Sequence, residues 1–313
     1  MPNTRQALDG RAMGIMVLLC MLWGIQQTHL KAVVDEISPM LLIALRSGIS
    51  AVLVALLMRY RQERMNIAQN WKPGLMVGSL FALEFLFVAE GLRYTSASHM
   101  IVLIYTAPIF VALGMHWLFP AERLSAVQWL GVILAFVGIG VTFLGHDKAN
   151  TTAASNMLWG DFLGVLSGLA WGATTVIVRG SSLANAPATE TLQYQLVATF
   201  ILLLGVALVT GQAEFNPTPV VWASLAFQGI VVSFISYLMW FALLRRYMAA
   251  QLGIFSFLTP LFGVLFGVLL LHEPLDGYFM AGACLVMLGI VIVSSYAWFT
   301  GWWQRRTEEQ RNL

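Results

Sequence analysis

Ten apolar runs, separated by short polar segments, account for most of this 313-residue sequence. A helix needs roughly 20 apolar residues to cross the hydrocarbon core of a bilayer, and the runs have about that length. A spanning β-barrel would instead need strands of alternating polarity, which the runs do not show. The pattern therefore predicts an all-α membrane protein with about ten transmembrane helices, at 12–34, 39–58, 74–92, 97–118, 124–144, 157–178, 191–209, 220–243, 250–271 and 277–300.

The composition excludes most soluble classes of protein. Hydrophobic residues make up 59% of the chain and charged residues only 10%, too few for a soluble globular chain. The net charge is +2 and the basic residues lie at the ends of the runs, so we expect no binding of nucleic acid. Cys20 and Cys284 lie inside apolar runs, and we expect no disulfide. The first run is too long for a signal-peptide core and should remain as a span.

The distribution of basic residues predicts the orientation, because short cytoplasmic loops collect Lys and Arg. With the N-terminus inside, 13 of the 17 basic residues fall on the inner side, and Lys31, Arg93 and Lys148 fall outside. Arg46 lies within a span. We therefore expect both termini to be cytoplasmic, in a cell inner membrane.

The second half of the chain repeats motifs of the first in the same order. The pairs are Leu22-Trp23-Gly24 with Ala170-Trp171-Gly172, Thr106-Ala107-Pro108 with Leu258-Thr259-Pro260, Glu122-Arg123-Leu124 with Glu273-Pro274-Leu275, and Gly131 and Gly138 with Gly282 and Gly289. This predicts two units of five helices, 12–144 and 157–300. Because five is odd, the second unit must have inverted topology. Inverted repeats place a solute site near the midplane, which indicates a transporter working by alternating access.

The motifs resemble those of the drug/metabolite transporter superfamily and, within it, the EamA-like permeases. The resemblance covers Arg11 to about Ser295 and rests on an ordered set: Leu22-Trp23-Gly24 with Lys31, Leu45-Arg46, Tyr94-Thr95-Ser96-Ala97 before Pro108, Glu122-Arg123-Leu124, Gly160-Asp161, and Thr259-Pro260 before Glu273-Pro274-Leu275. It implies ten helices, a central cavity and, in bacteria, mostly export of amino acids or other small metabolites. Gln27, His29 and Glu84 depart from the common pattern, so the resemblance does not identify the solute.

Two ionisable residues lie deep inside predicted spans. Glu84 is 12 residues from Lys72 and Arg46 is 13 from Arg59, which places both about 18 to 20 Å from the inner interface. A charge at that depth is costly unless it is paired or faces water, so both are candidates for function. The alternative is a structural ion pair between the two helices. Contact would favour that pair, whereas separation would favour Glu84 as the titrating group of proton-coupled transport.

Other polar and aromatic residues are candidates for the walls of the cavity. The polar run from Gln26 to His29 cannot face lipid on all sides, although hydrogen bonds between helices or core packing could also explain such residues. The full set of cavity candidates is Trp23, Gln26, Gln27, Glu84, Tyr105, Trp171, Thr174, Ser236, Tyr237, Trp240 and Ser256. Pro108 and Pro260 are predicted to bend their helices and act as hinges. His29, His99 and His272 are interpreted as interfacial histidines.

No sequence signature of an enzyme, a metal site or an ATP site is present, so we expect no catalytic residue and no cofactor. The expected partners are a small-molecule solute and the lipid bilayer, and a homodimer is left open. Two other readings also remain open: an uncoupled facilitator or channel, and a non-transporting receptor or assembly subunit.

Overall fold

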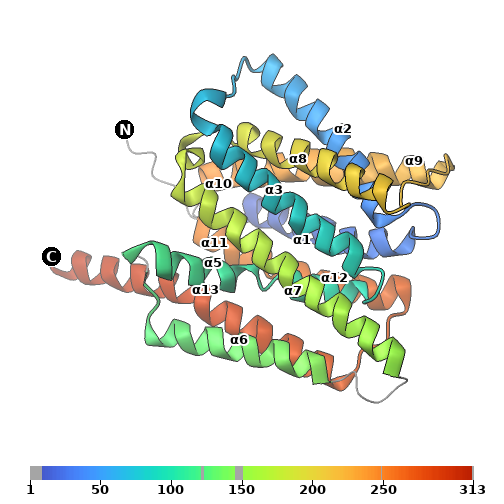
Figure 1. Cartoon of the computed structure of the whole chain (residues 1–313). Helices are drawn as coiled ribbons and strands as arrows, with labels where there is room; N and C mark the ends of the chain where they lie inside the picture. Colours follow the sequence, from blue (N-terminus) through green and yellow to red (C-terminus); the bar gives the residue numbers. More distant parts are fainter. Residues whose placement is uncertain (1–8, 121–122, 145–150, 248, 312–313) are drawn as a thin grey trace.

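The computed structural model of the chain describes residues 9–120, 123–144, 151–247 and 249–311 (Figure 1). Helices make up 84% of the structure, and no β-strand occurs in these ranges. Glu122 of the repeated Glu-Arg-Leu motif and Lys148 of the expected outer loop lie outside the described residues.

The helices follow the two halves of the sequence. The first half contains α1 (Gly10–Ala32), α2 (Pro39–Tyr60), α3 (Ile67–Gly91), α4 (Ala97–Ile104), α5 (Ala107–Leu118) and α6 (Ala126–Leu144). The second half contains α7 (Thr151–Gly180), the 3-10 turn η3 (Ser182–Asn185), α8 (Ala188–Val209), α9 (Pro219–Ala226), the π-helix η4 (Phe227–Ser236), α10 (Tyr237–Arg246), α11 (Ala249–Ser256), α12 (Leu258–Leu271) and α13 (Gly277–Arg311). We call the end of the bundle where α1 begins the proximal end, and the end where α1 finishes the distal end.

Within the described ranges, nine helical segments are long and apolar enough to cross a membrane. Two of these are composite: Ala97–Leu118 combines α4 and α5, and Pro219–Leu243 runs through α9, η4 and most of α10. The shorter apolar helix α12 follows α11 after Phe257 and completes a tenth apolar segment. The prediction of an all-α membrane protein with about ten spans is confirmed.

Two spans are interrupted just before a proline. Pro108 has no N–H to donate to the carbonyl of Ile104, and α4 ends at that residue. The Thr106 hydroxyl donates to the Leu103 carbonyl at 2.6 Å, and the Ile109 amide donates to the Thr106 carbonyl at 2.9 Å. These local bonds satisfy groups that the break would otherwise leave unpaired. In the second half, α11 ends at Ser256 and α12 begins at Leu258, with Pro260 in the first turn of α12. The breaks fall where the hinges were predicted, but their role as hinges stays a prediction.

Glycines allow the antiparallel helices α6 and α13 to lie in close contact, side by side in Figure 1. A Cβ atom on Gly131 would come within 2.8 Å of the Gly289 carbonyl oxygen, and one on Gly138 within 2.7 Å of the Gly282 carbonyl oxygen. Gly131 corresponds to Gly282 and Gly138 to Gly289 in the sequence repeat. Each contact therefore maps onto the other when the halves are exchanged, as expected for an inverted repeat.

The same exchange relates contacts of α1 and α7. Gly24 of α1 packs against the backbone of Phe262 and Gly263 in α12, while Gly172 of α7 packs against Phe110 and Val111 in α5. Each half thus places its first helix against the interrupted span of the other half. The two halves interlock around one interior.

The proximal and distal ends are closed by short polar contacts. At the proximal end, Asp9 caps α1 by accepting from the Ala12 amide at 2.7 Å, and it also accepts from the Tyr247 hydroxyl at 2.8 Å. These two bonds hold the pKa of Asp9 below its usual value. At the distal end, Ile37 and Phe215 form an isolated bridge between two loops.

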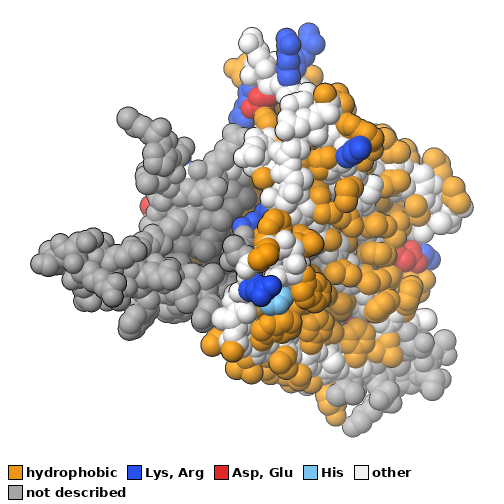
Figure 2. All heavy atoms as spheres, turned by 60° about the vertical axis from the view of Figure 1, so that its left-hand side comes forward, with side chains coloured by type: hydrophobic (Ala, Val, Ile, Leu, Met, Phe, Trp, Pro, Cys, Tyr) orange, Lys and Arg blue, Asp and Glu red, His pale blue; other side chains and the backbone are white. Residues whose placement is uncertain are grey.

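The outer surface of the bundle is apolar, as lipid contact requires. Figure 2 shows hydrophobic side chains over much of the described face, and Val52, Leu130 and Ile201 are each about 60% exposed. An open apolar groove of about 590 Å³ runs along α5 and α6, between Trp117, Trp129 and Phe136.

Candidate solute site

Arg46 lies at the centre of the bundle and is 1% exposed. Its Nη1 donates to the side-chain oxygen of Gln228 at 2.7 Å, and its guanidinium carbon lies 4.6 Å from the centre of the Phe85 ring. The Nε atom is buried and has no hydrogen-bond partner. A cation at this depth is held here by an amide and an aromatic face and not by a carboxylate.

Glu84, on the neighbouring helix α3, is also buried, and its Oε2 atom has no hydrogen-bond partner. No ion pair within 4.0 Å joins Glu84 to Arg46 among the described residues, although the two are close enough for their charges to interact. Buried polar atoms without partners are uncommon because they lose hydration without compensation. Of the two alternatives given by the sequence, contact or separation of Arg46 and Glu84, the structure therefore has the side chains separated.

Further buried polar atoms on α1 have no partner in the described structure. They are the side-chain oxygens of Gln27 and Thr28. Gln26 is buried as well, and its backbone carbonyl accepts from the Gln228 amide at 3.3 Å. The polar run in the first span therefore faces protein, and two of its side-chain oxygens remain available for bonding.

Aromatic side chains from both halves line this interior. Trp23 and Trp240 meet edge to face at 5.6 Å, and the Trp23 indole donates to the Ser236 hydroxyl at 2.9 Å. Tyr105 and Trp171 meet in the same way at 5.3 Å. Edge-to-face packing of this kind builds a rigid apolar wall with few polar groups, as solute sites do.

Tyr237 connects the aromatic walls to the charged centre. Its ring packs against Phe81 at 6.5 Å, and Phe81 in turn packs against Phe85 at 4.9 Å. Tyr237 interacts electrostatically with both Arg46 and Glu84. Tyr105 also interacts with Glu84 and Tyr237. Arg46, Glu84, Tyr105 and Tyr237, chosen from the sequence, are thus brought together.

Three of the predicted cavity residues use their hydroxyl groups within their own helices. Thr174 donates to the Ala170 carbonyl at 2.9 Å, Ser256 donates to the Gly253 carbonyl at 2.6 Å, and Ser236 donates to the Val232 carbonyl. Such bonds are common for hydroxyl side chains in apolar helices. Among the described residues, neither Thr174 nor Ser256 forms a hydrogen bond with Arg46 or Glu84.

The π-helix η4 positions Gln228, and sequence reasoning missed this feature. Gln228 accepts from Arg46, and its amide nitrogen lies 3.2 Å from Nδ1 of His29. The other ring nitrogen of His29 lies 3.3 Å from the Ser224 hydroxyl. Gln228 lies on the polar face of its span in the sequence, but the π register that turns it toward Arg46 leaves no clear sequence signal.

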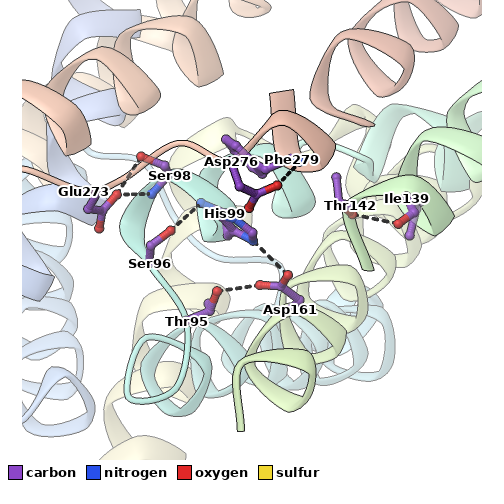
Figure 3. A network of polar contacts seen from close by, with 10 residues as sticks. All are labelled: Thr95, Ser96, Ser98, His99, Ile139, Thr142, Asp161, Glu273, Asp276 and Phe279. Carbon is purple, nitrogen blue, oxygen red and sulfur yellow. Dashed lines mark hydrogen bonds and ion pairs between the residues drawn. The ribbon is translucent and has the colours of Figure 1, made fainter. Parts of the chain in front are cut away.

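A second polar network, at the distal end, contains Asp161 and His99 (Figure 3). Asp161 is fully buried, accepts from the Thr95 hydroxyl, and lies 2.8 Å from Nδ1 of His99. The His99 ring stacks on Phe279 at 4.0 Å and is 3% exposed. The interpretation of His99 as an interfacial histidine is therefore wrong. The cause is that α4 begins inside the bundle, where α7 and α13 cover its first turn.

Glu273 holds the first turn of α4 in the same network. Its carboxylate accepts from the amides of Ala97 and Ser98, at 2.7 and 2.9 Å, and from the Ser98 hydroxyl at 2.6 Å. A carboxylate at a helix N-terminus is favoured by the helix dipole and by the unpaired amides. Lys31 of α1 donates to the carbonyls of Leu92 and Thr95 just before α4. Residues that the repeat motifs identified thus fix the distal end of the bundle.

Comparisons with known proteins identify the family and the fold. Residues 11–144 and 158–295 each match the EamA-like transporter family. The chain is 24% identical over 302 residues to the "Uncharacterized transporter YvbV" of Bacillus subtilis, covering 94% of this chain and 93% of that one. It is 23% identical to the "Probable amino-acid metabolite efflux pump" of Salmonella typhimurium, covering 88% and 92%. A solved crystal structure shares the fold, with a TM-score of 0.63 at 18% identity over 91% of this chain and 96% of the other.

Proposed function

Because the chain belongs to the EamA-like transporter family, we propose that this multi-pass membrane transporter is a secondary transporter that exports amino acids or related small metabolites. It works by alternating access in a cell inner membrane, with the proximal end and both termini in the cytoplasm. The excess of basic residues on that side supports the orientation. The name of the Salmonella relative supports the class of solute.

The observation that carries the proposal is the pair of opposite charges that do not bind each other. Arg46 and Glu84 are buried in one interior, and each has an atom without a partner. A cation and an anion that face each other would normally pair in a low-dielectric interior. Held apart, with Tyr105 and Tyr237 close enough to interact with them, they suit a small solute that carries charged groups and an apolar body.

We extend the proposal to coupling: Glu84 is the group that binds the transported proton. It is a buried acidic side chain near the middle of a span, and among the described residues no ion pair fixes its charge. A carboxyl group can bind a proton in one state of the cycle and release it in another only if no permanent partner holds it ionised.

Reconstitution into proteoliposomes tests both parts. Purified protein should exchange a labelled amino acid across the vesicle membrane, and an imposed proton gradient should drive net movement. Glu84→Gln should keep exchange and lose the gradient-driven component. The matched control is Glu90→Gln at the distal end of the same helix, where Glu90 pairs with Arg93 at 2.9 Å, and it should behave as wild type.

Three results would count against the proposal in different ways. Gradient-driven transport of normal rate in Glu84→Gln would remove Glu84 from coupling. Exchange that never responds to a proton gradient in the wild-type protein would indicate an uncoupled facilitator. No exchange with any solute of a broad panel would support a role as a receptor or assembly subunit.

A further inference from the structure

His29 is linked to the charged centre of the protein by an unbroken series of hydrogen bonds. The Arg46 guanidinium donates to Gln228, the Gln228 amide nitrogen contacts Nδ1 of His29, and Nε2 of His29 contacts Ser224. The series joins α2, η4, α1 and α9. It runs from the interior to the last turn of α1 at the distal end, where the His29 side chain is half-buried.

The donors and acceptors in this series fix the protonation state of His29. An arginine can only donate, so the group of Gln228 that faces Arg46 must be the oxygen, and the group that faces His29 must be the NH₂. Nδ1 of His29 must therefore be an unprotonated acceptor. In the neutral ring the single proton then lies on Nε2 and is donated to Ser224.

Protonation of His29 is incompatible with this series. In the imidazolium form both ring nitrogens are donors, so the Gln228 amide would face an N–H group. If the amide turned to accept from His29, its NH₂ would then face the Arg46 guanidinium. One proton bound at Nδ1 thus breaks either the bond between Gln228 and His29 or, if the amide turns, the bonds of Gln228 to Arg46 and to the Gln26 carbonyl.

The surroundings of His29 offer no group that could compensate. Among the described residues, Arg46 of α2 is the charged group that acts on the His29 ring. Its positive charge repels the positive charge that protonation would place there. Lys31 on the same helix is engaged with the Leu92 and Thr95 carbonyls. The faces of α9 and η4 that meet the ring present Ser224, Phe227 and Gln228, which do not ionise.

We infer that His29 is a proton-binding site that controls Arg46 through Gln228. A proton that arrives from the distal side binds Nδ1 of His29, and Gln228 loses its bond to His29 or its bond to Arg46. The contact between α1 and η4, which also includes the bonds from Gln228 to the Gln26 carbonyl and from Trp23 to Ser236, is weakened. The inference rests on the proposed function, since it places a second proton-binding group, apart from Glu84, on the path to the solute site. Its structural part can be tested without transport.

The first measurement is thermal unfolding of the purified protein at about pH 7.5 and about pH 5, which lie on either side of the range in which histidine titrates. His29→Asn keeps an acceptor for Gln228 and cannot bind a proton. The wild-type midpoint should fall relative to that of His29→Asn as the pH is lowered, because protonation breaks a bond that Asn retains. In a Gln228→Leu background this pH-dependent difference should be clearly smaller, because only the contributions of burial and of the Arg46 charge remain.

The matched control is His272→Asn. His272 is an exposed distal histidine with a left-handed backbone (φ 53°), a conformation that Asn tolerates. It should differ from wild type equally at both pH values. A His29→Asn difference that is independent of pH, or that is undiminished with Gln228→Leu, would overturn the inference.

The second measurement is solute exchange in proteoliposomes as the pH on the distal side is lowered. The wild-type rate should depend on that pH, and His29→Asn should lose the dependence while His272→Asn keeps it. An unchanged pH dependence in His29→Asn would exclude the coupling role even if the unfolding result held. If the wild-type protein exchanges no solute at all, the proposed function fails, and the unfolding measurement still decides whether the proton site exists.

Discussion

Replacing Gly138 by alanine tests the close packing of α6 against α13. A Cβ atom at this position would lie 2.6 Å from the Val286 amide nitrogen and 2.7 Å from the Gly282 carbonyl oxygen. Both neighbours are backbone atoms of a helix, so neither can rotate away. To reach ordinary contact at 3.4 Å the helices must separate locally by about 0.8 Å, a gap that forfeits roughly a quarter to a half of each dispersion contact around it.

We expect Gly138→Ala to destabilise the folded protein by about 1–3 kcal/mol, the usual range for overpacking a tight site. The control is Gly140→Ala on the same helix, where a Cβ atom meets nothing within 4 Å. That change should be neutral or slightly stabilising, since alanine favours the helix over glycine by up to about 1 kcal/mol. Comparing the two cancels the intrinsic helix preference and leaves the steric effect.

The assay is thermal or denaturant-induced unfolding in detergent, followed by tryptophan fluorescence. Gly282→Ala should behave like Gly138→Ala, because a Cβ atom there would lie 2.7 Å from the Gly138 carbonyl oxygen. The reasoning is refuted if Gly138→Ala and Gly140→Ala unfold at the same midpoint.

Three further predictions concern the ends of the bundle, the helix breaks and the topology. Asp9→Asn should reduce stability at neutral pH but not at low pH: the pKa of Asp9 is lowered in the folded state, so its contribution is present above the unfolded pKa and is lost as the pH falls through the folded one; an equal loss at all pH values would contradict this. Pro108→Ala and Pro260→Ala should each slow transport more than they reduce folded yield, and unchanged rates in both would leave only a packing role. A cysteine at Lys148 should react with an impermeant thiol reagent from outside and one at Arg61 should not; equal labelling would mean that the orientation is wrong.

The sequence predicted those features that each follow from a single physical requirement, such as the length of a span or the position of a helix break. The spans follow from the thickness of the hydrocarbon core, and the helix breaks follow from the missing N–H groups of Pro108 and Pro260. Gly138 was identified from the sequence as part of the repeat, while its close packing against α13 became apparent in the structure. Arg46 and Glu84 were identifiable because a charge inside an apolar run is expensive.

The features that the sequence did not predict depend on how helices pack against each other. The periodicity of a single helix carries no information about that packing. The contact between Arg46 and Gln228 requires the π register of η4, and a π-helix differs from an α-helix by the register of its hydrogen bonds and not by its residue types. The burial of His99 depends on α7 and α13 covering the start of α4. Without that cover, a histidine near the end of an apolar run would lie at the membrane interface.

The exchange of first helices between the halves has a consequence for biogenesis. Gly24 of α1 is inserted into the membrane when its packing partner, Gly263 of α12, is still about 240 residues from being synthesised. During that interval α1 must remain in lipid or against temporary neighbours, with Gln26 and Gln27 not yet enclosed. Transient exposure of such surfaces is where membrane and multidomain chains misassemble. The earliest helix to leave the ribosome therefore waits longer for its partner than α6 waits for α13, and quality-control factors have that time to recognise it.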